Sequence, residues 1–332
     1  MWLDVHGHDD VAERFRRLLA KRRLASTYLF VGPEGIGKRH FALRMAECLL
    51  CSERDDPLLD RCGRCQACLL TAAGNHPDLE IVQRREDRQE LTLDVILGDR
   101  EHRNREGLCH WLTLAPTLGT RRIAIIDDAD YFNEESANAL LKMLEEPPPR
   151  ALILLVGTTA NRQLPTIRSR CQIVRFRPLD LETVAELLLQ EGTARDREHV
   201  AQVAELCEGS LARAREMADE DVLRFREQLY SHLAAPHMDS VAASRHVREF
   251  VESAGSEARA RRTRLRTIMT FAADHYRGLL RTLTTSAGGP DAAAVDRCLA
   301  RLDRCLEGML HIERYANQSL VIDCWLDDLA HA

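Results

Sequence analysis

Four closely spaced cysteines are the clearest candidates for metal ligands in this sequence: Cys51, Cys62, Cys65 and Cys68. They follow the pattern C-x10-C-x2-C-x2-C. Thiolates this close together can converge on one tetrahedral Zn2+ at Zn–S distances of about 2.3 Å. Because four protein ligands leave no coordination position for water, the spacing predicts a structural zinc site and not a catalytic one.

Three alternatives for these cysteines are weaker. A disulfide framework would be unusual, because the chain has 11 cysteines, an odd number, and its first residues lack a secretory signal. Unrelated buried thiols would rarely cluster as they do in the polar run Cys-Gly-Arg-Cys-Gln-Ala-Cys of residues 62–68. A redox site would need only two cysteines. Zinc therefore stays the prediction.

A second candidate site is the sequence Gly-Pro-Glu-Gly-Ile-Gly-Lys of residues 32–38, which matches the phosphate-binding loop pattern G-x-x-x-x-G-K. The glycines of such loops, here Gly32, Gly35 and Gly37, let backbone N–H groups contact phosphate, and the lysine, Lys38, reaches the β- and γ-phosphates. The next residue is ordinarily a Ser or Thr that binds Mg2+, whereas here it is Arg39. Because a guanidinium cannot ligate a metal, ATP and Mg2+ are weaker cofactor predictions than zinc.

Acidic residues follow the apolar segment 123–126. Asp127 is placed like the aspartate that supports Mg2+ in other P-loop proteins. Hydrolytic proteins of this kind commonly have Glu at the next position to activate water, but this chain has the shorter Asp128, which would fall about 1 Å short. Asp130 is expected to cap a helix. The departures at Arg39 and Asp128 both predict weak or absent ATP hydrolysis.

Several longer motifs resemble one protein family. Residues 135–148 (ESANALLKMLEEPP) and 167–171 (IRSRC) are similar to signatures of bacterial clamp-loader subunits of the AAA+ class. Shorter segments fit the same family: residues 7–8, 28–30, 76–78 and 317–320. The resemblance covers nearly the whole chain, most specifically residues 26–178. In that family a four-cysteine insertion binds structural zinc, in agreement with the spacing described above.

The resemblance also implies roles for particular residues. The arginine of the Ser-Arg-Cys motif, here Arg170, would enter the ATP site of a neighbouring subunit and stabilise the transferring phosphoryl group. The alternative is an ordinary surface arginine, because Arg168 and Arg170 lie two residues apart on an extended segment. After the apolar run 151–156, Thr158 or Thr159 would serve as the polar sensor beside the phosphates.

ATP-hydrolysing relatives carry a further arginine in a Gly-Ser-Leu-Arg motif, which contacts the γ-phosphate. Here the corresponding residues 209–212 end in Ala212, and Arg213 follows one position later. One residue turns a helical side chain by about 100°, so Arg213 is expected to point elsewhere.

The function implied by the resemblance is that of a mostly rigid, stator-type clamp-loader subunit in the DNA polymerase III holoenzyme. It would help to load the sliding clamp on primed DNA, with weak or absent ATPase activity of its own. Its partners would be gamma/tau-type and delta subunits and, through the assembly, the sliding clamp and primer–template DNA. The alternative is a gamma/tau-type motor subunit that binds and hydrolyses ATP. A free-standing AAA+ ATPase is disfavoured by the cysteine insertion and the Ser-Arg-Cys motif.

Composition bounds these interpretations. The chain has 332 residues, about two domains' worth, with 45% hydrophobic and 30% charged residues. Its net charge of −6 argues against a strongly basic nucleic-acid-binding protein. The longest apolar run, residues 151–156, is far too short to cross a bilayer. We therefore expect a cytoplasmic protein without membrane contact.

Alternating strand and helix patterns must position the candidate residues. Apolar runs predict buried parallel strands at 28–31, 123–126, 151–156 and 172–176, and helical periodicity is expected at 11–24, 40–50, 108–115 and 134–146. The expected fold class is α/β: an AAA+ P-loop domain over 1–178, with the zinc-binding insertion at about 50–70. A small helical lid over 179–220 and an all-helical collar domain for oligomerisation over 221–332 would follow.

One arginine-rich segment stays ambiguous: Arg259, Arg261, Arg262, Arg264 and Arg266. Arginines in every direction around a helix, without interleaved aromatic residues, are typical of a solvated helix surface. Contact with DNA phosphates is the alternative.

Overall fold

The computed structural model describes residues 2–332 except 86, 87, 89, 104, 194–196, 286–290 and 314–316. The chain divides into two compact units, Met1–Ala218 and Asp219–Ala332. The predicted domain boundaries at 178 and 220 stay predictions, because the helical segment after residue 178 belongs to the first unit in this division.

A five-stranded parallel sheet is the centre of the first unit. Its strands lie in the order β2-β3-β4-β1-β5. Their bounds are β1 Thr27–Val31, β2 Leu79–Val82, β3 Arg122–Ile126, β4 Ala151–Val156 and β5 Gln172–Arg175. The three central strands β1, β3 and β4 are buried along their whole length, which explains their continuous apolar sequences.

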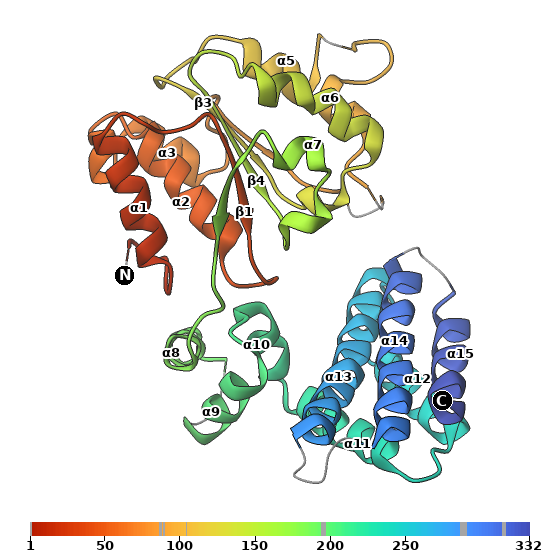
Figure 1. Cartoon of the computed structure of the whole chain (residues 1–332). Coiled ribbons are helices and arrows are strands. Elements are labelled where there is room, and N and C mark those ends of the chain that lie inside the picture. The colour runs from red at the N-terminus through yellow and green to blue at the C-terminus, as the bar shows by residue number, and fades with distance from the viewer. Residues whose placement is uncertain are drawn as a thin grey trace. The chain divides into compact units, whose positions relative to one another are not determined.

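Helices cover both faces of this sheet (Figure 1). Because side chains alternate across a strand, Phe30 packs with α1 and α2 on one face, and Leu29 packs with α4 to α7 on the other. The first face carries α1 Asp9–Ala20, α2 Lys38–Leu50 and α3 Gln66–Ala72. The second carries α4 Leu93–Leu97, α5 Gly107–Thr113, α6 Glu134–Glu145 and α7 Pro165–Arg168.

Short helices complete this unit. Its described loops contain three single-turn 3-10 helices: η1 Asp56–Leu58, η2 Ala129–Tyr131 and η3 Ala160–Arg162. After β5 the chain forms α8 Leu181–Glu191, α9 Arg197–Leu206 and α10 Leu211–Met217. Asp180 and Ser210 cap α8 and α10, since their side chains accept hydrogen bonds from backbone N–H groups in the first turn.

The second unit contains five described helices and, among the residues described, no strand. They are α11 Glu220–Ala234, α12 Ser240–Glu252, α13 Ala258–Thr285, α14 Ala292–Glu313 and α15 Gln318–His331. Helix α13 packs along α14, and α12 packs against α15. The buried side chains of Phe271 and Tyr276 on α13 and Trp325 on α15 contribute to its core.

The buried carboxylate of Asp78 organises the loop that leads to β3. It accepts backbone hydrogen bonds from Thr117, Leu118 and Gly119 at 2.6, 2.8 and 2.8 Å. Burial alone would raise the pKa of Asp78, but these N–H groups and the nearby Arg122 guanidinium outweigh burial and hold that pKa below its ordinary value. The family-like motif of residues 76–78 thus has a structural role here.

The predicted fold class is confirmed: a parallel P-loop sheet, a cysteine insertion and an all-helical C-terminal unit. Strand β2 was not predicted from the sequence, because this four-residue strand is only partly buried and lies at the edge of the sheet. The first helix ends at Ala20, four residues before the predicted end, because Arg22 adopts a positive φ of 52° that no α-helix can continue.

Candidate functional site

The phosphate-binding loop connects β1 to α2, as predicted. Two of its glycines, Gly35 and Gly37, have φ angles of 75° and 98°, a conformation that favours glycine. Gly37 is the residue before the first turn of α2. The loop therefore delivers the chain into a helix N-terminus, where free N–H groups favour an anion.

The side chain of Lys38 binds back to the phosphate-binding loop. Its Nζ donates to the backbone oxygens of Gly32 at 2.8 Å and Pro33 at 2.5 Å, and only 7% of the residue is exposed. Burial lowers the pKa of Lys38, although nearby carboxylates oppose this shift. A phosphate at this position would have to compete with two carbonyl oxygens for the ammonium group.

Arg39 forms an ion pair with Asp127, with Nε 3.5 Å from Oδ2. Asp127 follows the last residue of β3, where its burial raises the pKa of the carboxyl group and the Arg39 charge opposes that rise. Mg2+ requires oxygen ligands in a near-octahedral arrangement, and a guanidinium supplies only N–H donors. The residues at positions 39 and 127 therefore do not fit an ordinary Mg2+ site.

The next two acidic residues have different surroundings. Asp128 takes a left-handed conformation with φ 57°, and burial, then the charge of Asp127, raises the pKa of its carboxyl group. The carboxylate of Asp130 accepts hydrogen bonds from Thr158 N and Oγ1, at 2.7 and 2.6 Å, and from Gln163 Nε2 at 2.7 Å. The prediction that Asp130 caps a helix was wrong, since α6 is capped by Asn133 instead.

Thr158, the predicted sensor, lies in the same cavity as the P-loop. Its hydroxyl donates to Asp130, so this donor is already engaged within the chain. The hydroxyl could donate to a phosphate only after this hydrogen bond breaks, because an ionised phosphate oxygen accepts hydrogen bonds and does not donate them.

The cavity over the P-loop has a volume of about 770 Å3. Its walls come from the N-terminal residues, the P-loop, the ends of β3 and β4, and helices α8 and α10. The backbone N–H groups of Leu211 and Ala212 donate to Gly35 O at 3.1 and 3.4 Å, and a Cβ on Gly35 would meet Ser210 Oγ at 2.4 Å. The start of α10 therefore packs directly on the loop.

Ala212 lines this cavity, whereas the guanidinium of Arg213 pairs with Glu208 at 3.0 Å. Sequence reasoning missed Arg215, which also lines the cavity and pairs with Glu191 at 2.5 Å. The signal was available, because residues 212 and 215 are three apart and share one face of a helix.

Arg170 lies in the turn between α7 and β5. The next residue, Cys171, is buried, which raises the pKa of its thiol to about 12 and makes it an inert anchor. The Arg170 side chain is 32% exposed and pairs with Glu145, the last residue of α6. Arg168 is exposed and donates to Asn161 Oδ1 at 3.1 Å. The two arginines of this motif therefore face different partners.

The four predicted metal ligands converge. The sulfur atoms of Cys51, Cys62, Cys65 and Cys68 all lie within 4.8 Å of one another. Two Sγ–Sγ distances, Cys51–Cys65 and Cys62–Cys68, are 4.0 Å, close to the edge of about 3.8 Å that a ZnS4 tetrahedron requires. Backbone N–H groups point at three of the sulfurs from 3.3 to 3.4 Å. This cluster could hold a metal ion.

The cysteine segment is tied to the rest of its unit. Trp2 Nε1 donates to Leu59 O at 2.7 Å, and Arg61 pairs with the buried carboxylate of Glu47 on α2 at 3.1 Å. Cys51 itself follows the last residue of α2. A metal ion at the cluster would therefore join the end of α2 to α3.

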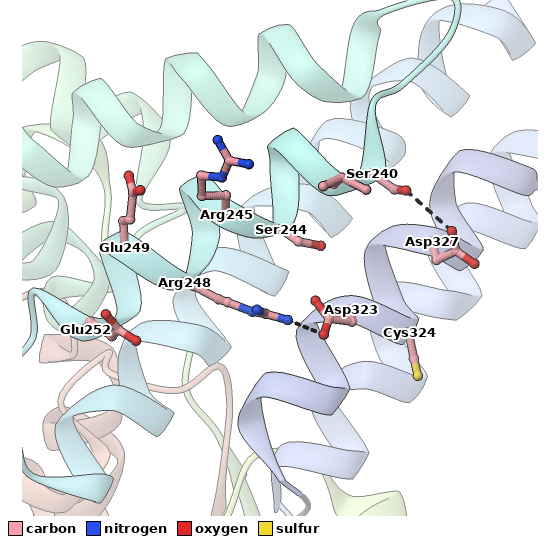
Figure 2. Close-up of a pocket in the computed structure, with 10 residues that line it drawn as sticks. Ser240, Ser244, Arg245, Arg248, Glu249, Glu252, Asp323, Cys324 and Asp327 are labelled. Carbon is pink, nitrogen blue, oxygen red and sulfur yellow. Dashed lines mark hydrogen bonds and ion pairs between the residues drawn. The ribbon is translucent and has the colours of Figure 1, made fainter.

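A second, smaller cavity of about 570 Å3 lies in the C-terminal unit between α12 and α15 (Figure 2). Figure 2 shows Arg248 pointing to Asp323, with which it forms an ion pair, and Ser240 donating to Asp327 at 3.4 Å. These polar and charged groups partner one another across the two helices. The contacts hold α12 and α15 together and assign no ligand to the cavity.

The arginine-rich segment lies at the start of α13. The side chain of Arg259 is outside the described residues, and the other four arginines are partly buried. Arg261 Nε donates to Gly255 O at 2.6 Å, and Arg264 stacks over the Phe250 ring at 4.5 Å. The surface of this arginine-rich segment is thus less solvated than predicted.

No helix among the residues described is long and apolar enough to cross a membrane.

Comparison with known proteins gives consistent similarities. The sequence profile of the family described as "DNA polymerase III, delta subunit" matches residues 7–180. The chain is 32% identical over 225 residues to DNA polymerase III subunit delta' of Pseudomonas aeruginosa, an alignment of 66% of this chain and 64% of that protein. It is 31% identical over 203 residues to subunit delta' of Bacillus subtilis, covering 61% and 56% of the two chains.

A similar match is found with DNA polymerase III subunit gamma/tau of Mycobacterium bovis, at 31% identity over 202 residues. That alignment covers 58% of this chain and 32% of the relative. The chain thus spans between about a third and about two thirds of the length of these three relatives.

Proposed function

The chain belongs to the DNA polymerase III delta-subunit family, and from that premise we propose that it acts as a delta-prime-type stator of the clamp loader. In this role it helps to load the sliding clamp on primed DNA in the cytoplasm. Its direct partners are gamma/tau-type and delta subunits, and it meets the clamp and primer–template DNA through the assembly. Its own ATPase activity is weak or absent.

The observation that carries this proposal is the Arg39–Asp127 ion pair at the P-loop. It supports a subunit that keeps the P-loop architecture without the metal chemistry of a motor. Two further features agree with it: Lys38 is bound to loop carbonyl oxygens, and Ala212 occupies the position of the lid arginine. The first occupies the ammonium group that would contact phosphate, and the second lacks a positive charge that ATP hydrolysis would use.

Arg170 is the residue through which such a stator would act. A planar guanidinium can donate two parallel hydrogen bonds to the oxygens of a transferring phosphoryl group. Arg170 is partly exposed in a turn held by the sheet, since its backbone oxygen accepts a hydrogen bond from Thr27 Oγ1 at 2.8 Å. We assign it the role of an arginine finger toward a neighbouring subunit's ATP site.

Cys51, Cys62, Cys65 and Cys68 would hold one structural Zn2+. Zinc fits because four thiolates at these separations satisfy its tetrahedral preference and leave no open position. When bound, the ion contributes folding free energy locally. Residues 179–220 would serve as the lid and residues 221–332 as the collar that joins the assembly.

A gamma/tau-type motor is the second candidate function. The observation in its favour is the cavity of about 770 Å3 over the P-loop, a volume ordinary for a ligand site. The glycine conformations of the loop also suit phosphate. The two functions differ in one measurable property, ATP hydrolysis by the chain alone.

The test compares ATP turnover and clamp loading by the isolated chain, by gamma/tau-type and delta subunits without it, and by the full mixture. A stator is silent alone and required in the mixture. High turnover by the isolated chain would establish the motor. Gamma/tau-type and delta subunits that load clamps equally well without the chain would refute the stator role.

A further inference from the structure

Arg170 is held on one edge by a single carboxylate oxygen. Its Nε donates to Glu145 Oε1 at 2.7 Å, and its Nη2 forms an ion pair with the same oxygen. The carboxylate belongs to the last residue of α6, 25 positions earlier in the chain. These two contacts fix the direction of the guanidinium edge formed by Nε and Nη2.

A second set of contacts holds Nη1 of Arg170 in place. Nη1 donates to Thr166 O at 2.9 Å and to Ser169 Oγ at 3.2 Å. A guanidinium has five N–H donors, so these contacts and the two to Glu145 leave one N–H of Nη2 uncommitted. The hydrogen bond from Nη1 to Ser169 Oγ is the longest and weakest of the four contacts. The edge formed by Nη1 and Nη2 is therefore the one that can turn to an incoming oxyanion.

The position of Glu145 is unfavourable for its own helix. A carboxylate in the last turn faces the negative end of the helix dipole, where a cation is preferred. The helix ends here because prolines occupy residues 147–149. The stability of α6 therefore does not explain a glutamate at this position, whereas its contact with Arg170 does.

We propose that Glu145 is a positioning residue for Arg170. Its carboxylate holds the edge of the guanidinium formed by Nε and Nη2, so that the end formed by Nη1 and Nη2 points outward. This inference rests on the proposed finger role of Arg170. An arginine side chain has many rotamers, and a finger already ordered by its own subunit loses less entropy when it meets phosphate. The pair is partly exposed, at 32% for Arg170 and 49% for Glu145, so its effect on folding is small.

The experiment is a double-mutant cycle in the reconstituted loader. The variants are Glu145→Ala, Glu145→Gln, Arg170→Ala and the Glu145→Ala/Arg170→Ala double variant. Glu146→Ala is the matched control, because it removes an exposed carboxylate from the adjacent position, whereas Arg170 pairs with Glu145. DNA- and clamp-stimulated ATPase is measured as kcat and KM, with thermal unfolding and zinc content as checks of folding.

We expect Glu145→Ala to lower kcat at the dependent site by about tenfold, because a displaced guanidinium loses alignment with its target. Glu145→Gln should lose less, since its amide oxygen still accepts a hydrogen bond. KM should change little, and Glu146→Ala should match the wild type. In the Arg170→Ala background, loss of Glu145 should have no further effect, because the residue acts only through the arginine.

Three results would overturn the inference: an unchanged rate for Glu145→Ala, a raised rate, or a loss that adds to that of Arg170→Ala. A raised rate would mean that the carboxylate masks the finger instead of aiming it. If Arg170→Ala itself has no effect, the finger role fails and this inference with it. If Arg170→Ala lowers the rate but Glu145→Ala does not, only this inference fails. Should Glu145→Ala not fold, Glu145→Gln carries the same test.

Discussion

Arg39 and Asp127 bind each other across the mouth of the P-loop, with Nε 3.5 Å from Oδ2. In a P-loop motor these two positions hold Mg2+ together, one through a hydroxyl and the other through a carboxylate. Here the positive charge beside Asp127 comes from the side chain of Arg39 and not from a bound metal ion. The ion pair therefore balances the charge of the partly buried aspartate without a metal ion.

The isolated chain should turn over ATP little or not at all. The Mg2+ ligand at position 39 is missing, and Asp128 is too short to orient water as a glutamate would. Lys38→Ala should for the same reason barely change the ATPase activity of the assembled loader. Steady-state phosphate release by the purified chain measures this directly. Turnover at the rate of its motor relatives, abolished by Lys38→Ala, would contradict the stator role.

Arg39→Thr should create a dependence on Mg2+ that the wild type lacks. The substitution supplies a hydroxyl ligand and frees the Asp127 carboxylate, the two groups that a P-loop metal site needs. A fluorescence titration with an ADP analogue, in Mg2+ and in EDTA, compares the affinities. Arg162→Thr is the control, because Arg162 lines the same cavity outside the ion pair. Wild-type binding that tightens with Mg2+ as strongly as the variant's would disprove this account.

Arg170→Ala should act only in the assembled loader. Folding, zinc content and assembly should be intact, because the side chain is partly exposed. The neighbouring site should slow by about 10^3-fold, the scale of other trans arginines, while bulk ATPase falls less because other sites keep their own fingers. Lysine should rescue poorly, since it lacks the planar fork. Unchanged stimulated ATPase and clamp loading would show that the motif is structural.

Metal analysis should find about one Zn2+ per chain, and Cys65→Ser should remove it. The variant should unfold more easily and be cleaved by proteases within residues 51–68, with the sheet still folded. Cys324→Ser is the matched control, because this thiol is exposed, lies on α15 of the second unit and is not one of the four clustered cysteines. Carefully purified protein without zinc would refute the assignment.

Asp78→Asn should destabilise the first unit at neutral pH by about 2–3 kcal/mol, because three backbone N–H groups lose a charged acceptor. The folded-state pKa of Asp78 lies below its unfolded value of about 3.9. The contribution of the carboxylate is therefore fully present above that value and is lost as pH falls through the folded-state pKa. Urea unfolding from pH 7 to pH 3 should show the two proteins converging on acidification. A constant difference in unfolding free energy would exclude this linkage.

Much of the site could be predicted because its determinants are local in the sequence. Cys51, Cys62, Cys65 and Cys68 lie within 18 residues, so short loops suffice to bring their sulfurs within 4.8 Å. The P-loop likewise depends on glycines next to one strand and one helix. The central strands were recognisable because strands buried on both faces are apolar throughout.

Only the tertiary structure decided which side chains distant in sequence become partners. The sequence predicted that Arg39 could not bind a metal, but only the sheet brings it to Asp127, 88 positions later. Asp130 was expected to cap a helix and instead holds Thr158, because β3 and β4 are neighbours and end at the same edge of the sheet. Glu145 meets Arg170 for a similar reason. A polar side chain takes whichever partner the packed backbone brings within about 3 Å, and residue type and spacing alone do not encode that distance.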